Sequence, residues 1–290
     1  MTQRVLLLLN PHSRLGETAE AQVRRELTIL GFDLVAVEGL PDRFASAIRQ
    51  YQNQVDCVII GGGDGSVNAA IEGLLETRLP IGVLPLGTAN NLARTLGIPS
   101  DLAGACQTIA QGQIRAIDLG WVNGRYFLNV AGIGLSANIN RSVEKKMKRR
   151  WGVIAYAMTG LKLIFKQRRM RAEIRCNGEV IQTKTYQITV CNGRHYGSGL
   201  TVAADATIDD QRLDLCSLEI QHWWQVFWLL PALTRGEYAA GRGVRVLQGQ
   251  AIEIYTRFPA AIDTDGEITT QTPAQFKVIP GAISVYVPEQ

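Results

Sequence analysis

The sequence predicts an N-terminal α/β domain with a doubly wound parallel sheet, followed by a sandwich-like domain of antiparallel β structure. Up to Asp118, largely apolar strands alternate with helical segments. Beyond it, apolar and polar residues alternate, and turn dipeptides such as Asn123-Gly124 and Asn177-Gly178 interrupt the runs. A chain of 290 residues can form two such domains, each with its own core. We predict that they span residues 1–119 and 120–290.

The first domain is expected to hold a parallel sheet, because apolar strands joined by helices are typical of sheets covered on both faces. The expected strands are Arg4–Leu9, Phe32–Val37, Val55–Ile60 and Ile81–Leu84. The expected helices are Glu17–Leu30, Pro41–Gln50, Val67–Leu75 and Asn91–Leu96. In the second domain, β structure is expected over 121–130 and 170–220, with helical inserts over 136–166 and 223–233.

The composition is that of a folded protein, with 46% hydrophobic and 19% charged residues. Its five cysteines occur singly and without a CxxC pair, so we expect small buried side chains and a reducing, cytoplasmic setting. The first apolar run is too short for a signal sequence, and no stretch reaches the roughly 18 apolar residues of a membrane span. The net charge of +4 only weakly favours anionic partners.

A glycine-rich turn, Gly61-Gly62-Gly63-Asp64-Gly65-Ser66, follows the third expected strand and opens a helix. Glycines let backbone N–H groups approach phosphate oxygens, and a helix N-terminus attracts anions. The alternative is a tight strand-to-helix turn that binds nothing. Neither the dinucleotide spacing GxGxxG nor a Gly-Lys-[Ser/Thr] phosphate loop is present. A second turn, Gly87-Thr88-Ala89-Asn90, follows the next strand, and two such turns should face one crevice.

Taken together, the two turns resemble the diacylglycerol kinase catalytic domain superfamily, which includes bacterial lipid kinases and has sphingosine kinases as relatives. The wider fold group includes NAD kinases and phosphofructokinases. The resemblance extends to Asn10-Pro11, to Ile117–Gly120 and to Asp263–Glu267, and so covers nearly the whole chain. It implies an enzyme that transfers phosphate from ATP, with Mg2+, to a lipid hydroxyl in lipid metabolism such as phospholipid biosynthesis.

The resemblance also implies roles for individual residues. The residues expected around the nucleotide and its metal are Asn10, Gly61, Gly62, Gly63, Asp64, Gly65, Ser66, Asn68, Gly87, Thr88, Asn90 and Asp118. Asp265 or Glu267, in the segment Asp-Gly-Glu, would accept the proton of the attacking hydroxyl, as phosphoryl transfer requires. The sequence does not choose between them, and Asp265-Gly266 could also be an ordinary hairpin tip.

A structural magnesium site is implied at the side chain of Asp210 and the carbonyl groups of Thr207 and Arg212. Gln211 stands where the family usually has glycine, and Asn91 where many members have aspartate. The latter change removes one charge from the implied metal network.

A basic run over residues 145–151, ending in a tryptophan, suits peripheral association with an anionic membrane, although a solvated helix face is the alternative. A lipid at such a surface is therefore the expected partner; no nucleic acid is expected, and a homodimer is left open. Two other functions stay open: an NAD kinase-like enzyme with a soluble substrate, and a non-catalytic nucleotide- or lipid-binding regulator. The lipid itself is not identified.

Overall fold

The computed structural model describes residues 2–135, 137, 169–193, 195–196, 200–201, 207–221, 225 and 243–289. The chain divides into two compact units: Met1–Asp118 with Pro280–Gln290, and Leu119–Ile279. The two expected helical inserts and the basic run over 145–151 lie outside the described residues, apart from isolated positions of the inserts.

The first unit contains a parallel sheet in the order β2-β1-β3-β4-β18, in which every neighbouring pair is parallel. Its strands are β1 (Arg4–Leu9), β2 (Asp33–Glu38), β3 (Cys57–Gly62), β4 (Ile81–Pro85) and the end of β18 (Ala274–Val287). Residues of β3 and β4 are buried throughout, as expected for strands covered on both faces. The predicted parallel α/β fold is confirmed.

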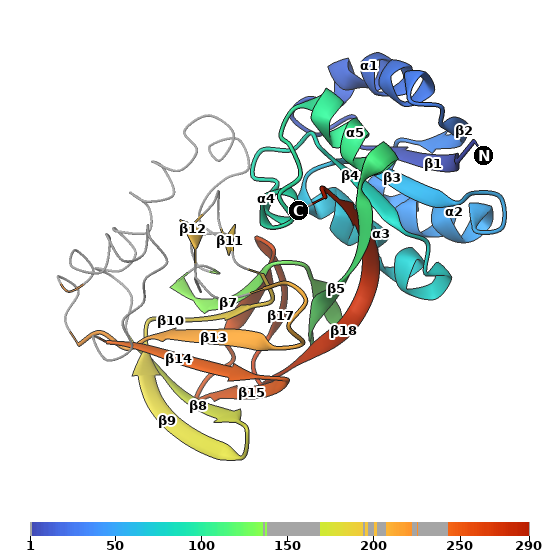
Figure 1. Cartoon of the computed structure of the whole chain (residues 1–290). Coiled ribbons are helices and arrows are strands. Elements are labelled where there is room, and N and C mark those ends of the chain that lie inside the picture. The colour runs from blue at the N-terminus through green and yellow to red at the C-terminus, as the bar shows by residue number, and fades with distance from the viewer. Residues whose placement is uncertain are drawn as a thin grey trace. The chain divides into compact units, whose positions relative to one another are not determined.

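Helices cover both faces of this sheet. On one face α1 (Gly16–Ile29) packs with α5 (Leu102–Gln111), and on the other α2 (Phe44–Tyr51) packs with α3 (Asp64–Thr77), as Figure 1 shows. The 3-10 helix η1 (Pro41–Arg43) precedes α2, and the short helix α4 (Asn91–Thr95) follows β4.

The C-terminal strand differs from the predicted domain limits. Val285 of β18 pairs with Ile81 of β4, so the last residues belong to the first unit rather than to the second. The pairing joins positions that are far apart in the sequence, and no local sequence pattern predicts it. The chain therefore passes between the units twice, through β5 (Gln113–Val122) and through β18.

The second unit is built from antiparallel sheets, as predicted. One sheet has the order β14-β13-β10-β7-β16-β17; the other continues from β18 through β15, β8 and β9, with β5 and β6 beside it. The strands are β6 (Arg125–Phe127), β7 (Val130–Gly134), β8 (Met170–Cys176), β9 (Glu179–Thr185), β10 (Gln187–Cys191), β13 (Leu213–Leu218), β14 (Val244–Gly249), β15 (Ala251–Thr256), β16 (Ala261–Thr264) and β17 (Glu267–Gln271). A separate ribbon pairs β11 (His195–Tyr196) with β12 (Leu200–Thr201).

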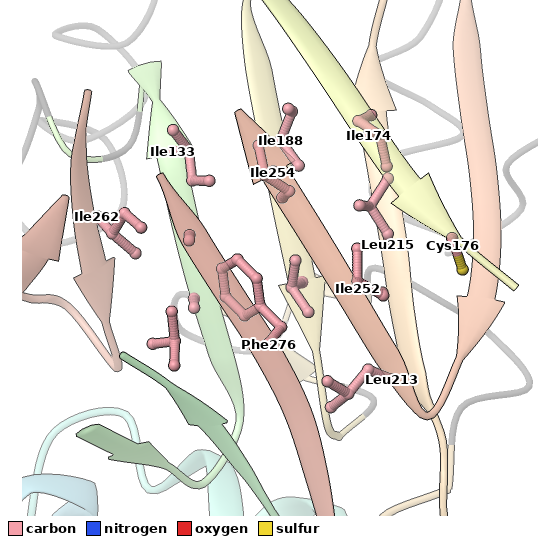
Figure 2. Packing of buried hydrophobic residues seen from close by; sticks show 14 of the residues in the cluster. Ile133, Ile174, Cys176, Ile188, Leu213, Leu215, Ile252, Ile254, Ile262 and Phe276 are labelled. Atoms are coloured by element: carbon pink, nitrogen blue, oxygen red, sulfur yellow. The ribbon is translucent and has the colours of Figure 1, made fainter. Parts of the chain in front are cut away.

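A hydrophobic core fills the space between these two sheets (Figure 2). Phe276 and Ile254 enter it from one sheet, and Ile133 and Ile188 from the other; each is at most 1% exposed. Burying large apolar side chains of this kind stabilises a fold by roughly 1.5–3 kcal/mol each. The second unit therefore has a core of its own.

Two of the expected hairpin turns are present. Asn123 and Gly124 join β5 to β6, and Asn177 and Gly178 join β8 to β9, all with positive φ. This geometry belongs to the type I′ turn, which asparagine and glycine adopt at little cost.

Four of the five cysteines are buried and Cys216 is half-buried, in agreement with the predicted packing role. Burial raises the pKa of the Cys57 thiol to about 12. Among the helices in the described ranges, none combines the length and apolar character that a membrane crossing requires.

Candidate active site

The first expected site residues lie where the order of the parallel strands reverses. The chain leaves β1 for β2 on one side, and β3 lies on the other side of β1. In open α/β sheets, ligands bind at the carboxyl ends of the strands at such a switch point. Here the N–H of Asn10 donates to the Gly61 carbonyl at 2.9 Å, and its Nδ2 donates to Ser66 Oγ at 3.0 Å. The loop after β1 is thereby joined to the glycine-rich turn.

Contacts inside the protein disfavour a side chain at three of the four glycines in this turn. A Cβ on Gly61 would lie 2.5 Å from Cδ1 of Leu9, and a Cβ on Gly62 would collide with the Ser66 side chain. A Cβ on Gly63 would lie 3.3 Å from the Cα of Gly87, and one on Gly87 would lie 2.5 Å from the Cα of Gly63. The two expected turns therefore touch backbone to backbone, as their neighbouring strands predict.

No contact inside the protein disfavours a side chain at Gly65. A Cβ built there meets no atom within 4 Å, its φ lies outside the positive region, and the residue is exposed. It belongs to the first turn of α3, whose N-cap, Gly63, has no side chain with which to cap the helix. The first N–H groups of a helix carry partial positive charge and are satisfied from outside its hydrogen-bond ladder. In α3 the N–H of Ser66 already donates to the Gly63 carbonyl at 2.9 Å, so the groups that remain for an anion are those of Asp64 and Gly65. An anion can therefore approach α3 at Gly65.

Asp64 fastens the two turns together. Its two carboxylate oxygens accept the N–H groups of Asn91 at 3.0 Å and of Leu92 at 2.9 Å. These groups lie in the first turn of α4, so Asp64 caps that helix from another loop. The carboxylate is thus a structural element of the site, whatever else it binds.

The side chain of Asn90 locks the second turn. It adopts a φ of 50°, accepts from the N–H of Gly87 at 3.0 Å and donates to the Pro85 carbonyl at 3.0 Å. Thr88, at the tip of this turn, is exposed. The adjacent Asn91 has a buried Oδ1 with no hydrogen-bond donor among the described residues. A buried acceptor in this position suits a donor or a hydrated cation from a ligand.

Asp118 and Asn68 complete the residues expected in the first unit. Asp118 is 2% exposed and accepts the N–H of Gly281 at 2.8 Å, so its carboxylate holds β18 beside β5. Asn68 is half-buried in α3, within the first two turns of the helix.

The carboxylate of Asp265 in the second unit is also engaged by backbone. Asp265 and Gly266 form a type I′ turn between β16 and β17, with φ of 48° and 92°. The carboxylate accepts the N–H groups of Leu128, Asn129 and Val130 at 2.7, 3.0 and 3.1 Å. It therefore anchors the hairpin tip to the start of β7, and the lone pairs facing these N–H groups are not available to a substrate hydroxyl.

Glu267 has the opposite surroundings. It is the first residue of β17 and is exposed, and its side chain makes no hydrogen bond or ion pair to another described residue. Of the two carboxylates that the sequence could not tell apart, Glu267 is the one free to accept a proton. Asp263, two residues before the turn, is fully buried.

Asn129 is a further polar residue at this end of β7, and sequence reasoning missed it. It is 1% exposed, and neither its Oδ1 nor its Nδ2 has a partner among the described residues. Its backbone is held on both sides, by Asp265 and by the N–H of Asn192, which donates to its carbonyl at 2.9 Å. The only sequence signal was an amide within the otherwise apolar run from Phe127 to Val130.

The loop of the expected magnesium site keeps the turn that a glycine would form. Gln211 has a φ of 61°, so it adopts the left-handed conformation despite its side chain. Asp210 Oδ1 accepts the N–H of Arg212 at 3.1 Å, and Oδ2 lies 3.6 Å from the Arg212 guanidinium. Together with the carbonyl groups of Thr207 and Arg212 that the resemblance implies, this carboxylate would form an all-oxygen set of the kind that Mg2+ prefers, with water completing it. Among the described residues, no three acidic, histidine or cysteine side chains form a metal cluster.

Enzymes that transfer phosphate combine groups that bind an anion with a carboxylate that accepts a proton, and the two units provide one residue type of each kind. Residues 4–122 match the Diacylglycerol kinase catalytic domain, and residues 129–287 match the YegS C-terminal NAD kinase beta sandwich-like domain. The chain belongs to the diacylglycerol kinase catalytic domain superfamily.

Individual relatives agree with this assignment. A diacylglycerol kinase of Bacillus subtilis (strain 168) is 29% identical over 248 residues, which are 84% of this chain and 80% of that protein. One of Staphylococcus aureus (strain bovine RF122 / ET3-1) is 27% identical over 294 residues, covering 99% of this chain and 93% of that protein. A solved structure from Bacillus anthracis str. Sterne, assigned as a diacylglycerol kinase, superposes with a TM-score of 0.84 at 26% identity and covers 98% of this chain and 95% of its own.

Proposed function

We propose that this protein is an ATP-dependent lipid kinase that transfers the γ-phosphate to a lipid hydroxyl, with diacylglycerol as the first substrate to test. The observation that carries the proposal is the open N-terminus of α3 at Gly65 in a chain of this superfamily. The names of the relatives support a lipid acceptor, and the membership of a kinase family supports ATP as the donor.

The nucleotide phosphates would lie at the first turn of α3, where the N–H groups stabilise negative charge without a side chain. The hydrogen bond between Asn10 and Ser66 fixes this turn to the loop after β1. Asp64 and Asn90 fix the position of the neighbouring Gly87 turn. A bound Mg2+ would neutralise phosphate charge, and the buried Asn91 Oδ1 would accept a hydrogen bond from the water around it. Asp210 would hold a second, structural ion.

Glu267 would accept the proton of the lipid hydroxyl as the oxygen attacks the γ-phosphorus. The bond from that phosphorus to the bridging oxygen breaks, and ADP leaves with the electron pair. Asp265 would keep the turn in place through its three backbone hydrogen bonds and is a positioning residue. The buried amide of Asn129, on the same segment, could orient the hydroxyl.

The test is transfer of labelled γ-phosphate from ATP by the purified chain. Diacylglycerol in detergent micelles and NAD would be offered in parallel, with and without EDTA, followed by a panel containing a sphingoid base, a polyprenol and a phosphatidyl lipid. We expect label in lipid only, and its loss with EDTA. Label in NAD instead would overturn the proposal, and ATP binding without transfer to any acceptor would favour a regulator.

A further inference from the structure

Strands β15, β8 and β9 are neighbours in one sheet of the second unit (Figure 1). Three basic residues lie next to one another across these strands. Arg171 on β8 pairs directly with Lys184 on β9. On the other side of β8, the N–H of Arg257, just past the end of β15, donates to the Arg171 carbonyl at 3.4 Å. Residues paired across antiparallel strands point to the same face, and all three are exposed. We call Arg171, Lys184 and Arg257 the cationic row.

The neighbouring positions on the same sheet face are neutralised. Arg175 lies 2.7 Å from Glu173 and 3.8 Å from Glu253, and Gln182 donates to Glu173. Within the described part of the chain, no carboxylate pairs with the cationic row. Like charges that face each other across strands weaken a sheet. The cationic row therefore lowers the stability of the sheet, and sheet formation does not explain why these residues are there. Residues that lower stability without a structural reason are typical of functional positions.

An exposed aromatic ring stands beside the row. Phe258 directly follows Arg257 and is 71% exposed, the highest value among the exposed large hydrophobic residues that the structure describes. The Arg257 guanidinium lies 5.3 Å from the centroid of the ring. Cations that flank an exposed aromatic ring suit an anionic bilayer, because the ring enters the interface while the cations meet lipid headgroups.

We propose that the cationic row and Phe258 form the surface by which this protein docks on an anionic lipid bilayer. The inference rests on the proposed function, because a lipid kinase must collect its substrate from a membrane. Strand β16 begins three residues after Phe258 and ends at the Asp265 turn. The docking surface and the free carboxylate of Glu267 thus lie at opposite ends of one short strand.

The test is co-sedimentation with phosphatidylcholine vesicles, prepared with and without phosphatidylserine. We expect the wild type to bind only the anionic vesicles. A variant with Arg171→Gln, Lys184→Gln and Arg257→Gln should bind about 100-fold more weakly, since each cation near the surface contributes on the order of a fivefold affinity. Phe258→Ser should weaken binding about tenfold. The matched control is Arg245→Gln on β14, in the other sheet, where the guanidinium pairs with Glu219 at 2.7 Å; it removes the same charge away from the row and should change binding less than about twofold.

Transfer to a soluble, short-chain diacylglycerol separates docking from catalysis, and the triple variant should keep the wild-type kcat there. The proposed docking surface is overturned if the wild type does not bind anionic vesicles, or if the triple variant binds them equally well. The proposed kinase function would still stand in that case if the protein transfers phosphate to lipid in micelles. Row-dependent vesicle binding without phosphorylation of any lipid would remove the proposed function and leave the surface. Binding of an oligonucleotide through the row, with none to vesicles, would assign it to another polyanion and overturn the proposal.

Discussion

Asp64 in the first unit and Asp265 in the second are the aspartates of the two most informative motifs, and both direct their carboxylates to backbone N–H groups. They differ in what lies beside them. Next to Asp64 is Gly65, where an open helix terminus can bind an anion; next to the Asp265 turn is Glu267, a free carboxylate that can bind a proton. The comparison teaches that the motif aspartates hold the backbone in both units, while the residues beside them, Gly65 and Glu267, are exposed.

The largest difference in stability is expected between alanine substitutions at two glycines of the first unit. Gly87→Ala places a Cβ 2.5 Å from the Cα of Gly63 and should lower the free energy of unfolding by about 2–3 kcal/mol. Gly65→Ala meets nothing, and alanine in a helix should raise the free energy of unfolding by up to about 1 kcal/mol. Chemical denaturation of each variant measures both changes.

ATP titration of the same variants sharpens the comparison. Gly65→Ala should weaken ATP binding at least tenfold although the fold is intact, because its methyl group occupies the approach to α3. Wild-type affinity in a stable Gly65→Ala protein would show that the phosphates bind elsewhere.

A smaller effect is expected when the aspartate that caps a helix is removed, either at the proposed site or away from it. Asp64→Ala removes the cap of α4, and Asp101→Ala removes the cap of α5, where Asp101 Oδ1 accepts the N–H of Gly104 at 2.8 Å. Each substitution should lower the free energy of unfolding by about 1–2 kcal/mol. Only Asp64→Ala should also raise the KM for ATP, because the Gly87 turn loses its tether to the glycine-rich loop. Equal KM values in the two variants would contradict the positioning role of Asp64.

Much of the first unit could be predicted because its signals are local. The apolar strand Arg4–Leu9 is observed with the predicted limits, and the two glycine turns meet because their strands are neighbours. The pairing of β18 with β4 could not be predicted, since it depends on a contact between distant segments and the first half of the same strand pairs antiparallel with β15.

The sequence singled out the two glycine turns and the Asp-Gly-Glu segment more readily than it indicated what each of their residues contacts. It attributed four glycines to phosphate binding, whereas contacts inside the protein disfavour a side chain at each of them except Gly65. It could not separate Asp265 from Glu267, because the three N–H donors come from residues 128–130, far away in the sequence. The buried amide of Asn129 was missed for a related reason: burial is a property of the folded unit rather than of the residue type.

The measurement that tests the account most directly compares Glu267→Gln with Asp265→Asn, using single-turnover phosphate transfer and the free energy of unfolding. Glu267 is exposed, so its variant should keep the wild-type stability within about 0.5 kcal/mol and lose at least about 100-fold in transfer rate. Asp265→Asn turns an amide donor toward backbone N–H groups, so it should lose about 1–3 kcal/mol of stability together with rate. A Glu267→Gln protein that transfers phosphate at the wild-type rate would contradict the central claim that this carboxylate accepts the proton of the hydroxyl.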